Sequence, residues 1–371
     1  MDNYKYSSNT NTGVGLANFK AFCCMFVLYI VIYPLELDSL LRMIMFAIYL
    51  IVFWIIYNQL VICGIKKIDF VMLAVSIMLI LFELVFYEIP LNVNTIQAVM
   101  CYVLFMLIIC VQSSIKIVPK MHNCLLLTAE IAAVVLSIYS FLPFAYYFRG
   151  TSTTSTLLTL NFDNANFTGI VLFSLFSIIL IEHRRSKFKL WLYGLMTYLI
   201  YLIYLTGSRT CLATTIIVLV FSIFFSKKRI PTIIILGIEV IPFIFLPIYI
   251  YLSKQQTNTL MFMGKRVFSG RQDIYVRYLE LMNGKVEWLF GNMKEIFFLN
   301  TGNGPFALVC SMGIIVTICF YIIYIRNIIS CNKVSETFEG KVAIITMLAF
   351  AIHTCSESSM VLGVIICLFI Y

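Results

Sequence analysis

Long unbroken apolar runs dominate this chain from residue 21 onward. Runs such as Met72–Val85 and Thr232–Leu252 lack the regular apolar–polar alternation that membrane β-barrel strands require. A run of about 20 apolar residues crosses a bilayer as a helix. The pattern therefore predicts an all-α, polytopic integral membrane protein. The predicted spans lie near residues 21–35, 43–61, 70–88, 96–113, 124–145, 166–181, 190–206, 211–226, 232–252, 306–325 and 342–357.

The last apolar segment, Met360–Tyr371, is short for a span at about 1.5 Å per residue. The total is therefore about 11 to 12 transmembrane helices. The expected organisation is a cytoplasmic segment at 1–20, transmembrane helices 1–9 at 21–252, one large extracytoplasmic loop at 253–305 and the C-terminal transmembrane helices at 306–371.

Composition supports the membrane assignment. Hydrophobic residues make up 62% of the chain and charged residues 12%, with a mean hydropathy of +0.99. A soluble domain carries about 25% charged residues, so that class is excluded. The 12 cysteines lie almost all inside apolar runs without a CxxC pair, which indicates small apolar side chains rather than disulfides or metal ligands. The polar N-terminal segment lacks a basic start, so the first span is expected to be its own insertion signal.

Positive charge orients the predicted bundle. With a cytoplasmic N-terminus, the inner connections hold 16 of the 26 lysines and arginines, and every inner connection is short and basic. The outer face then keeps two sizeable loops, at 148–165 and 253–305. In the second loop, Asp273–Phe290 has the pattern of an amphipathic helix. The apolar side of that helix is formed by Ile274, Tyr278, Leu281 and Leu289.

Arginines on the outer face run against the charge rule and point to an anionic, lipid-linked substrate. Arg209 is the most unusual of them, because it lies between two apolar runs with almost no loop around it. A guanidinium there is costly facing lipid, so it faces the bundle interior or a wet cavity, unless it snorkels or caps a helix at a tight turn.

Four segments, read together, indicate a family. Leu205–Thr210 contains a Gly-Ser-Arg turn, Phe162–Gly169 an Asn-x-Asn pattern at the start of a span, and Phe268–Arg271 a Ser-Gly-Arg motif before the amphipathic helix. Gly302–Gly304, followed by Ser311–Ile315, leads out of the large loop. In this order the segments resemble the O-antigen ligase and polysaccharide polymerase superfamily over residues 160–320.

The resemblance implies a metal-independent glycosyltransferase in the bacterial cytoplasmic membrane that acts on undecaprenyl-pyrophosphate-linked oligosaccharides at the outer face. Ligase-type relatives carry a His in or beside the large loop, whereas 253–305 contains none and Asn303 stands near the expected place. The polymerase branch is therefore favoured over the O-antigen ligase branch. Donor and acceptor oligosaccharides are the implied substrates, and a translocase and a chain-length regulator are the implied protein partners; no cofactor and no nucleic acid are expected.

The chemistry of such a transfer selects particular residues. Arginines stabilise the charge that develops on a leaving diphosphate and bind it bidentately. Arg209 and Arg271 are expected to do this catalytically. Solvated loop surfaces are the alternative for the further basic residues. The predicted substrate-binding residues are Arg149, Arg266 and Arg277 for the lipid carrier, with Ser208 beside Arg209, and with Asp163 and Asn166 either capping a helix or binding sugar hydroxyls.

The acceptor hydroxyl needs a base. His353 lies near the outer end of its span, and Glu357 follows four residues later on the same helix face, a spacing that suits a general base. A structural interhelical hydrogen bond is the alternative for this pair, and Asp273 and Glu280 are competing bases. His122 and His183 fall on the cytoplasmic side.

A proton-coupled translocase or other secondary transporter is the rival function. Glu83, Glu130 and Glu239 lie within predicted spans, where ionisable residues are commonly functional. The chain lacks evident internal repeats and paired broken helices, which favours the enzyme. A scaffolding protein is the third alternative and predicts no preference for arginine outside. No nucleotide-binding motif or metal-spaced cluster is present.

Overall fold

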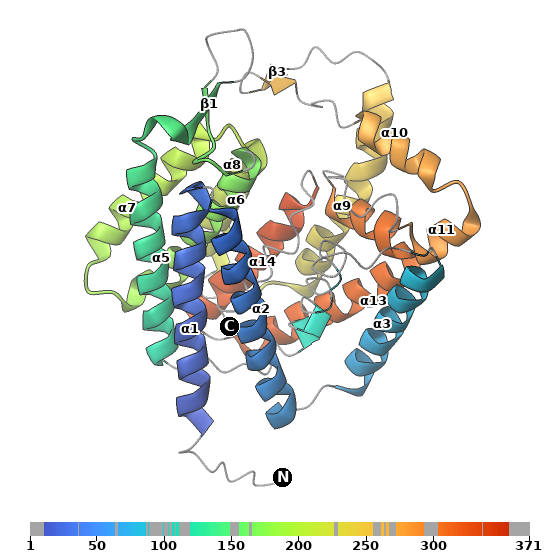
Figure 1. Ribbon diagram of the computed structural model, residues 1–371, viewed down its shortest axis with the longest axis horizontal. Coiled ribbons are helices and arrows are strands. Elements are labelled where there is room, and N and C mark those ends of the chain that lie inside the picture. The colour runs from blue at the N-terminus through green and yellow to red at the C-terminus, as the bar shows by residue number, and fades with distance from the viewer. Residues whose placement is uncertain are drawn as a thin grey trace. The chain divides into compact units, whose positions relative to one another are not determined.

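The chain is almost entirely helical, which confirms the all-α prediction (Figure 1). Two short β-ribbons are the other regular elements in the described parts of the chain. The computed structural model describes residues 11–35, 37–63, 66–86, 88, 119–148, 156–162, 165–225, 229–254, 261–262, 265–266, 272–292, 303–335 and 337–355, and separate positions between 99 and 110.

Five described helices are long and apolar enough to cross a membrane. Their counterparts are all among the predicted spans, so the membrane-protein class is supported at this level. Four further apolar helices are shorter, and most of the predicted span at 96–113 lies outside the described residues. The five long segments are Leu16–Leu35, Lys67–Phe86, Pro119–Tyr139, Ala165–Arg185 and Gly304–Lys333.

Apolar side chains also cover much of the described surface. Met43 and Met78 are each 70% exposed, and Ile223 is 75% exposed. Soluble proteins seldom expose contiguous apolar surface on this scale, whereas lipid tails solvate it without cost. The exposed faces of these helices therefore suit a bilayer.

The chain divides into two compact units. Unit 1 comprises residues 1–64 and 115–206, and unit 2 comprises 65–114 and 207–371. The helices of unit 1 are α1 (Asn11–Ile32), α2 (Asp38–Cys63), α5 (Pro119–Tyr139), α6 (Ala165–Glu182) and α7 (Lys189–Leu205), with 3-10 turns at Tyr33–Leu35, Pro143–Ala145 and His183–Arg185 and an antiparallel ribbon of β1 (Tyr146–Phe148) and β2 (Thr156–Leu158).

Helix α6 is the centre of unit 1. It is apolar on all sides, and 14 of its 18 residues are buried, because α5 and α7 both pack against it. At its C-terminal end Glu182 is fully buried and paired with a histidine and an arginine. The Glu182 carboxylate lies 2.6 Å from Nδ1 of His122 on α5 and 3.1 Å from Nε of Arg185. The pairing offsets the cost of burying this carboxylate.

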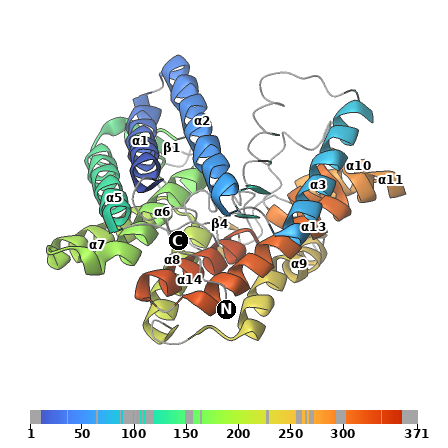
Figure 2. The ribbon, with the colours of Figure 1, turned by 90° about the horizontal axis from the view of Figure 1, so that it is seen from below.

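Unit 2 is built around two helices that touch most of the others (Figure 2). Helix α13 (Gly304–Val334) packs on α3 (Lys67–Phe86), α9 (Thr232–Lys254) and α14 (Phe338–His353). Helix α14 packs in turn on α8 (Arg209–Phe225) and α9. The remaining elements of unit 2 are β3 (Met261–Phe262), β4 (Lys265–Arg266), α10 (Gln272–Leu281) and α11 (Lys285–Phe290).

The prediction of a single amphipathic helix at Asp273–Phe290 is wrong. Two helices, α10 and α11, are separated by a break at Met282–Gly284, where Gly284 precedes α11 in an extended conformation. Because the break changes the direction of the second helix, Leu289 is 44% exposed. Tyr278 is fully buried, as predicted.

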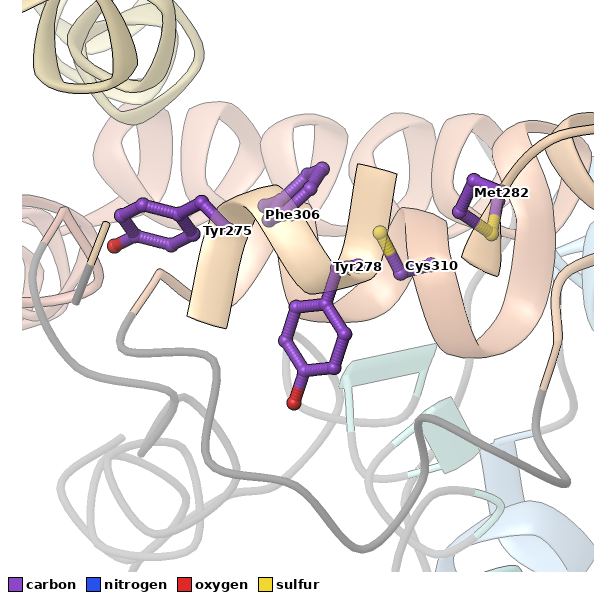
Figure 3. Packing of buried hydrophobic residues seen from close by; sticks show 5 residues of the cluster. All are labelled: Tyr275, Tyr278, Met282, Phe306 and Cys310. Carbon is purple, nitrogen blue, oxygen red and sulfur yellow. The ribbon is translucent and has the colours of Figure 1, made fainter. Parts of the chain in front are cut away.

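Helix α10 is anchored by an apolar cluster (Figure 3). Tyr275, Tyr278 and Met282 pack with Phe306 and Cys310 of α13. Both tyrosine rings meet Phe306 edge-on, with ring centroids 5.7 and 6.1 Å apart. Burial of one such large apolar side chain contributes about 1.5–3 kcal/mol to the free energy of unfolding. This part of the predicted loop is therefore packed against α13 rather than solvated on all sides.

Helix α13 is broken at Gly313, and the end of α11 packs against this break. Gly313 has φ 78° and ψ 167° inside the helix, which interrupts the ladder of hydrogen bonds there. The backbone N–H of Asn292 donates to the carbonyl of Cys310 at 2.8 Å and so replaces a lost helical partner. A Cβ atom on Gly313 would collide with the backbone of Leu289. The close approach of two backbones explains the glycine at this position.

Candidate functional site

The Gly-Ser-Arg segment forms a tight turn into α8, as its sequence predicts. Gly207 takes φ 61°, a left-handed conformation that glycine adopts readily, and α8 begins at Arg209. The Ser208 carbonyl accepts from the N–H of Leu212 at 3.1 Å, which makes Ser208 the cap residue. Ser208 is buried and Arg209 is half-buried.

The first turn of α8 contacts the last residue of α14. Sγ of Cys211 lies 3.3 Å from Nε2 of His353, and both residues are 0% exposed. The two positions are 142 residues apart in sequence. Unit 2 therefore places His353 against the turn that carries Ser208 and Arg209.

Asn303 joins three helices next to this contact. Its Oδ1 accepts from the N–H of Phe306 at 2.9 Å and so caps α13, while its Nδ2 donates to the Cys355 carbonyl at 3.1 Å and to the Pro242 carbonyl of α9 at 3.4 Å. The N–H of Gly304 donates to the Thr354 carbonyl at 2.9 Å. Donor groups at the start of α13 thus hydrogen-bond to backbone carbonyls just beyond the end of α14, where neither helix supplies a partner of its own.

Six hydrogen bonds each join, within one unit, two residues that the charge pattern assigns to the same membrane face. On the predicted inner side these are His122–Glu182, Asp69–Arg326 and Ile230–Asn332, and on the predicted outer side Pro34–Asn161, Cys211–His353 and Gly304–Thr354.

The sequence-predicted site residues divide between the two units. Ser208, Arg209 and His353 come together in unit 2, while Asn166 lies in the first turn of α6 in unit 1. Arg277 is exposed on α10. Arg266 belongs to β4, and its side chain is outside the described part of the chain. Arg149, Asp163, Arg271 and Glu357 also lie outside the described residues.

Helix α14 ends at His353, and Thr354 is its C-terminal cap. The predicted i, i+4 pairing would need the helix to continue to Glu357, which lies outside the described residues, so this pairing stays a prediction. The structure places His353 against the Cys211 thiol.

The competing carboxylates differ in their surroundings. Glu280 is exposed on α10, and Asp273 lies in the first turn of that helix. Glu239 on α9 is 1% exposed, and neither of its carboxylate oxygens has a hydrogen-bond partner among the residues that the structure describes. Glu83 on α3 is equally buried, and Glu130 in unit 1 is half-buried.

Tyr278 offers no base. Burial raises the pKa of its phenol well above the usual range, with a smaller contribution from Cys310, although the nearby Arg277 opposes the shift. The hydroxyl is therefore protonated at neutral pH, and its contribution in α10 is packing.

Two residues of this region were missed by the sequence analysis. Cys211 was assigned to the apolar background, and its sequence carries no signal that distinguishes it from the other cysteines. Asn303 was noted only as a substitute for a histidine. Its Asn-Gly-Pro setting is a recognisable helix start, because asparagine favours the N-cap and proline the first turn. In the parts of the chain that the structure describes, no group of three or more His, Cys, Asp or Glu side chains could hold a metal ion.

Comparison of the chain with protein-family models, curated proteins and solved structures gives no match. The resemblance to the ligase and polymerase superfamily therefore rests on the four motifs alone.

Proposed function

We propose that this protein is a polysaccharide repeat-unit polymerase of the bacterial cytoplasmic membrane. In this proposal it transfers a growing O-antigen or capsule glycan from undecaprenyl pyrophosphate to the non-reducing end of a lipid-linked repeat unit at the outer face. The N-terminus is cytoplasmic, 11 to 12 helices span the bilayer, and 253–305 is extracytoplasmic. A translocase would supply the substrate, and a chain-length regulator would act on the product.

The reaction needs a charge-stabilising group and a proton acceptor. An acceptor hydroxyl attacks the anomeric carbon, the bond from that carbon to the diphosphate oxygen breaks, and the diphosphate leaves with the electron pair. The hydroxyl proton passes to a base. Arg209 and Arg271 are the proposed stabilisers of the diphosphate, because a guanidinium keeps its charge and binds phosphate with two parallel hydrogen bonds.

One observation supports this proposal above the others. The arginine turn at the start of α8 meets the histidine at the end of α14 through the contact of Cys211 with His353. The sequence predicts a role for both Arg209, by its motif, and His353, by its chemistry, in one reaction, although they lie in segments far apart in the sequence. His353 is the proposed base through its Nδ1 atom, because Nε2 is in contact with the Cys211 thiol.

The remaining proposed contacts surround the diphosphate and the sugars. Ser208 lies beside Arg209 at the start of α8 and can donate to a phosphate oxygen. Arg149, Arg266 and Arg277 would hold the lipid carrier. Asp163 and Asn166 would bind sugar hydroxyls near the start of α6, and no metal takes part.

The size ladder of surface polysaccharide tests the function in cells. A strain without the gene is complemented with the wild-type chain, Arg209→Ala or Arg271→Ala. We expect single repeat units in the deletion strain and in both variant strains, and a full ladder with the wild type. An unchanged ladder in the deletion strain would contradict the proposal.

A proton-coupled translocase is the second candidate, because of Glu239. A buried carboxylate without a hydrogen-bond partner in the described chain is the group that such a carrier would use to take up a proton. The same ladder discriminates the two. Loss of a translocase removes repeat units from the outer face altogether, whereas loss of a polymerase leaves them there unjoined.

A further inference from the structure

We infer that Cys211 is a positioning residue for Arg209, acting through its hydrogen bond with His353. The inference rests on the proposed function and deepens it, since it says how the arginine turn is held in register for the leaving diphosphate. Cys211 was not among the residues selected from the sequence.

The contact is built from two fully buried polar groups. Cys211 and His353 are each 0% exposed, and their Sγ and Nε2 atoms are 3.3 Å apart. The sulfur of a thiol, like the oxygen of a serine hydroxyl, accepts a hydrogen bond from the imidazole when Nε2 carries the ring proton. Loss of the thiol would take this partner from an imidazole nitrogen away from water, at a cost typical of unsatisfied buried groups.

Helix geometry links Cys211 to the direction of Arg209. Successive residues are rotated by about 100° around an α-helix, so positions 209 and 211 project from nearly opposite sides of α8. A bond that fixes Cys211 against α14 therefore fixes the rotation of the turn about its axis. The direction of Arg209, which is half-buried, is then set together with this turn.

Side chains within α8 stiffen the same turn. The hydroxyl of Thr215 donates to the Cys211 carbonyl at 2.7 Å, and that of Thr214 donates to the carbonyls of Thr210 at 2.9 Å and Cys211 at 3.0 Å. Both threonines are fully buried. The backbone of the arginine turn is thus tied to the following turn on the side that faces the bundle.

The histidine is held equally firmly from the other side. It is the last residue of α14, and the next two carbonyls, of Thr354 and Cys355, accept from Gly304 and from the Asn303 side chain. The start of α13 therefore fixes the end of α14, and the end of α14 fixes the start of α8. Cys211 is the final connection in this series.

Kinetics of the purified full chain on lipid-linked repeat units test the inference. Cys211→Val removes the hydrogen bond, Cys211→Ser keeps an acceptor, and Cys310→Val removes an equally buried thiol from the apolar cluster. Misplacement of a charge-stabilising group lowers kcat more than it raises KM. We expect kcat to fall about tenfold or more in Cys211→Val, with KM within about twofold, and rescue to within about threefold in Cys211→Ser.

The control separates positioning from packing. Cys310→Val is expected to leave kcat within about twofold of the wild type. Equal kinetics in Cys211→Val and Cys310→Val would overturn the inference, as would a rise in KM alone. A Cys211→Ser variant as poor as Cys211→Val would also count against the hydrogen bond.

A double-mutant cycle gives a readout that does not need the proposed activity. The melting temperatures of Cys211→Val, His353→Leu and the double variant are compared in detergent. We expect the second substitution to add little once the first is made, since both remove one bond. Additive losses would overturn the inference whatever the enzyme does. Absence of polymer from the wild-type chain would overturn the proposed function instead, and the cycle would still decide the contact.

Discussion

At the scale of single residues, the proposed function requires an arginine at position 209 and not merely a positive charge. Arg209 begins α8 directly after a buried serine cap. A guanidinium presents a planar fork of donors to a diphosphate, whereas a lysine offers a flexible point charge that is more strongly hydrated. A purely topological or snorkelling cation would be replaced by lysine without loss.

Arg209→Lys is therefore expected to lose most of the activity. Arg209→Ala is expected to lower the rate on the order of 100-fold or more. The measurement is the rate of polymer formation by purified variants at saturating substrate. A stricter comparison combines Arg209→Lys with Arg271→Lys in one chain. Full activity of that double variant would show that a point charge is enough and that bidentate binding of phosphate is not used.

Glu182 gives a residue-scale prediction about stability. Glu182→Gln puts a neutral amide beside Arg185 and His122 in a buried position, and breaking a buried ion pair such as that of Arg185 costs about 3 kcal/mol. We expect the melting temperature of the purified protein to fall by several degrees. Glu130→Gln is the matched control, because Glu130 is half-buried and has no ion pair in the described structure. Equal melting temperatures for the two variants would refute the role of the ion pair.

At the scale of elements, hydrogen bonds at helix ends and at a helix break hold the helices of unit 2 together. The start of α13 is capped by Asn303 and bonded beyond the end of α14, and the break at Gly313 accepts the backbone of Asn292. These hydrogen bonds use main-chain groups that the interruption of a helix leaves free. They also fix the loop helices α10 and α11 next to the proposed site.

Gly313→Ala is expected to destabilise the protein by about 2 kcal/mol or more. The added Cβ would meet the backbone of Leu289 and would also force an unfavourable φ on alanine. Thermal unfolding of the purified variant measures the effect.

The control for this substitution is Gly237→Ala in α9. A Cβ atom there meets nothing within 4 Å, and alanine favours a helix over glycine by about 0.5–1 kcal/mol. Gly237→Ala should therefore leave the melting temperature unchanged or raise it slightly. If Gly313→Ala behaved like Gly237→Ala, the close approach of the two backbones would not exist in solution.

At the scale of the whole molecule, the alternation of the spans makes a prediction about membrane sides. Short tags are inserted in two turns, at the half-buried Ser186, which the charge pattern places inside, and at the exposed Asn283, which it places outside. We expect antibody binding in intact cells for the tag at Asn283 only. Binding at both tags, or at Ser186 alone, would contradict the proposed orientation.

Hydropathy predicted the helices well because span length and apolar composition are local properties of the chain. All described long helices begin or end within about ten residues of a predicted span. The interruptions were missed, since they depend on tertiary contacts. The break at Gly313 is stabilised by Asn292, and the split of α10 from α11 by packing of Tyr275 and Tyr278 on α13.

The candidate site was predictable only in part for the same reason. Arg209 and Ser208 were selected because a charged turn between apolar runs is conspicuous in a sequence. His353 was selected for its chemistry, but its contact with Cys211 on α8 was not expected. No local sequence pattern predicts a contact between Cys211 and a histidine 142 residues away.

Polymer formation by the purified protein tests the central claim most directly. The wild-type chain and Arg209→Ala are incubated with undecaprenyl-pyrophosphate-linked repeat units as the sole substrate, without metal, and the products are separated by size. The account predicts a ladder of joined repeats and release of undecaprenyl diphosphate from the wild type, and a loss of about 100-fold or more in Arg209→Ala. Repeat units that stay unjoined with the wild-type chain, or a ladder that Arg209→Ala forms equally well, would contradict it.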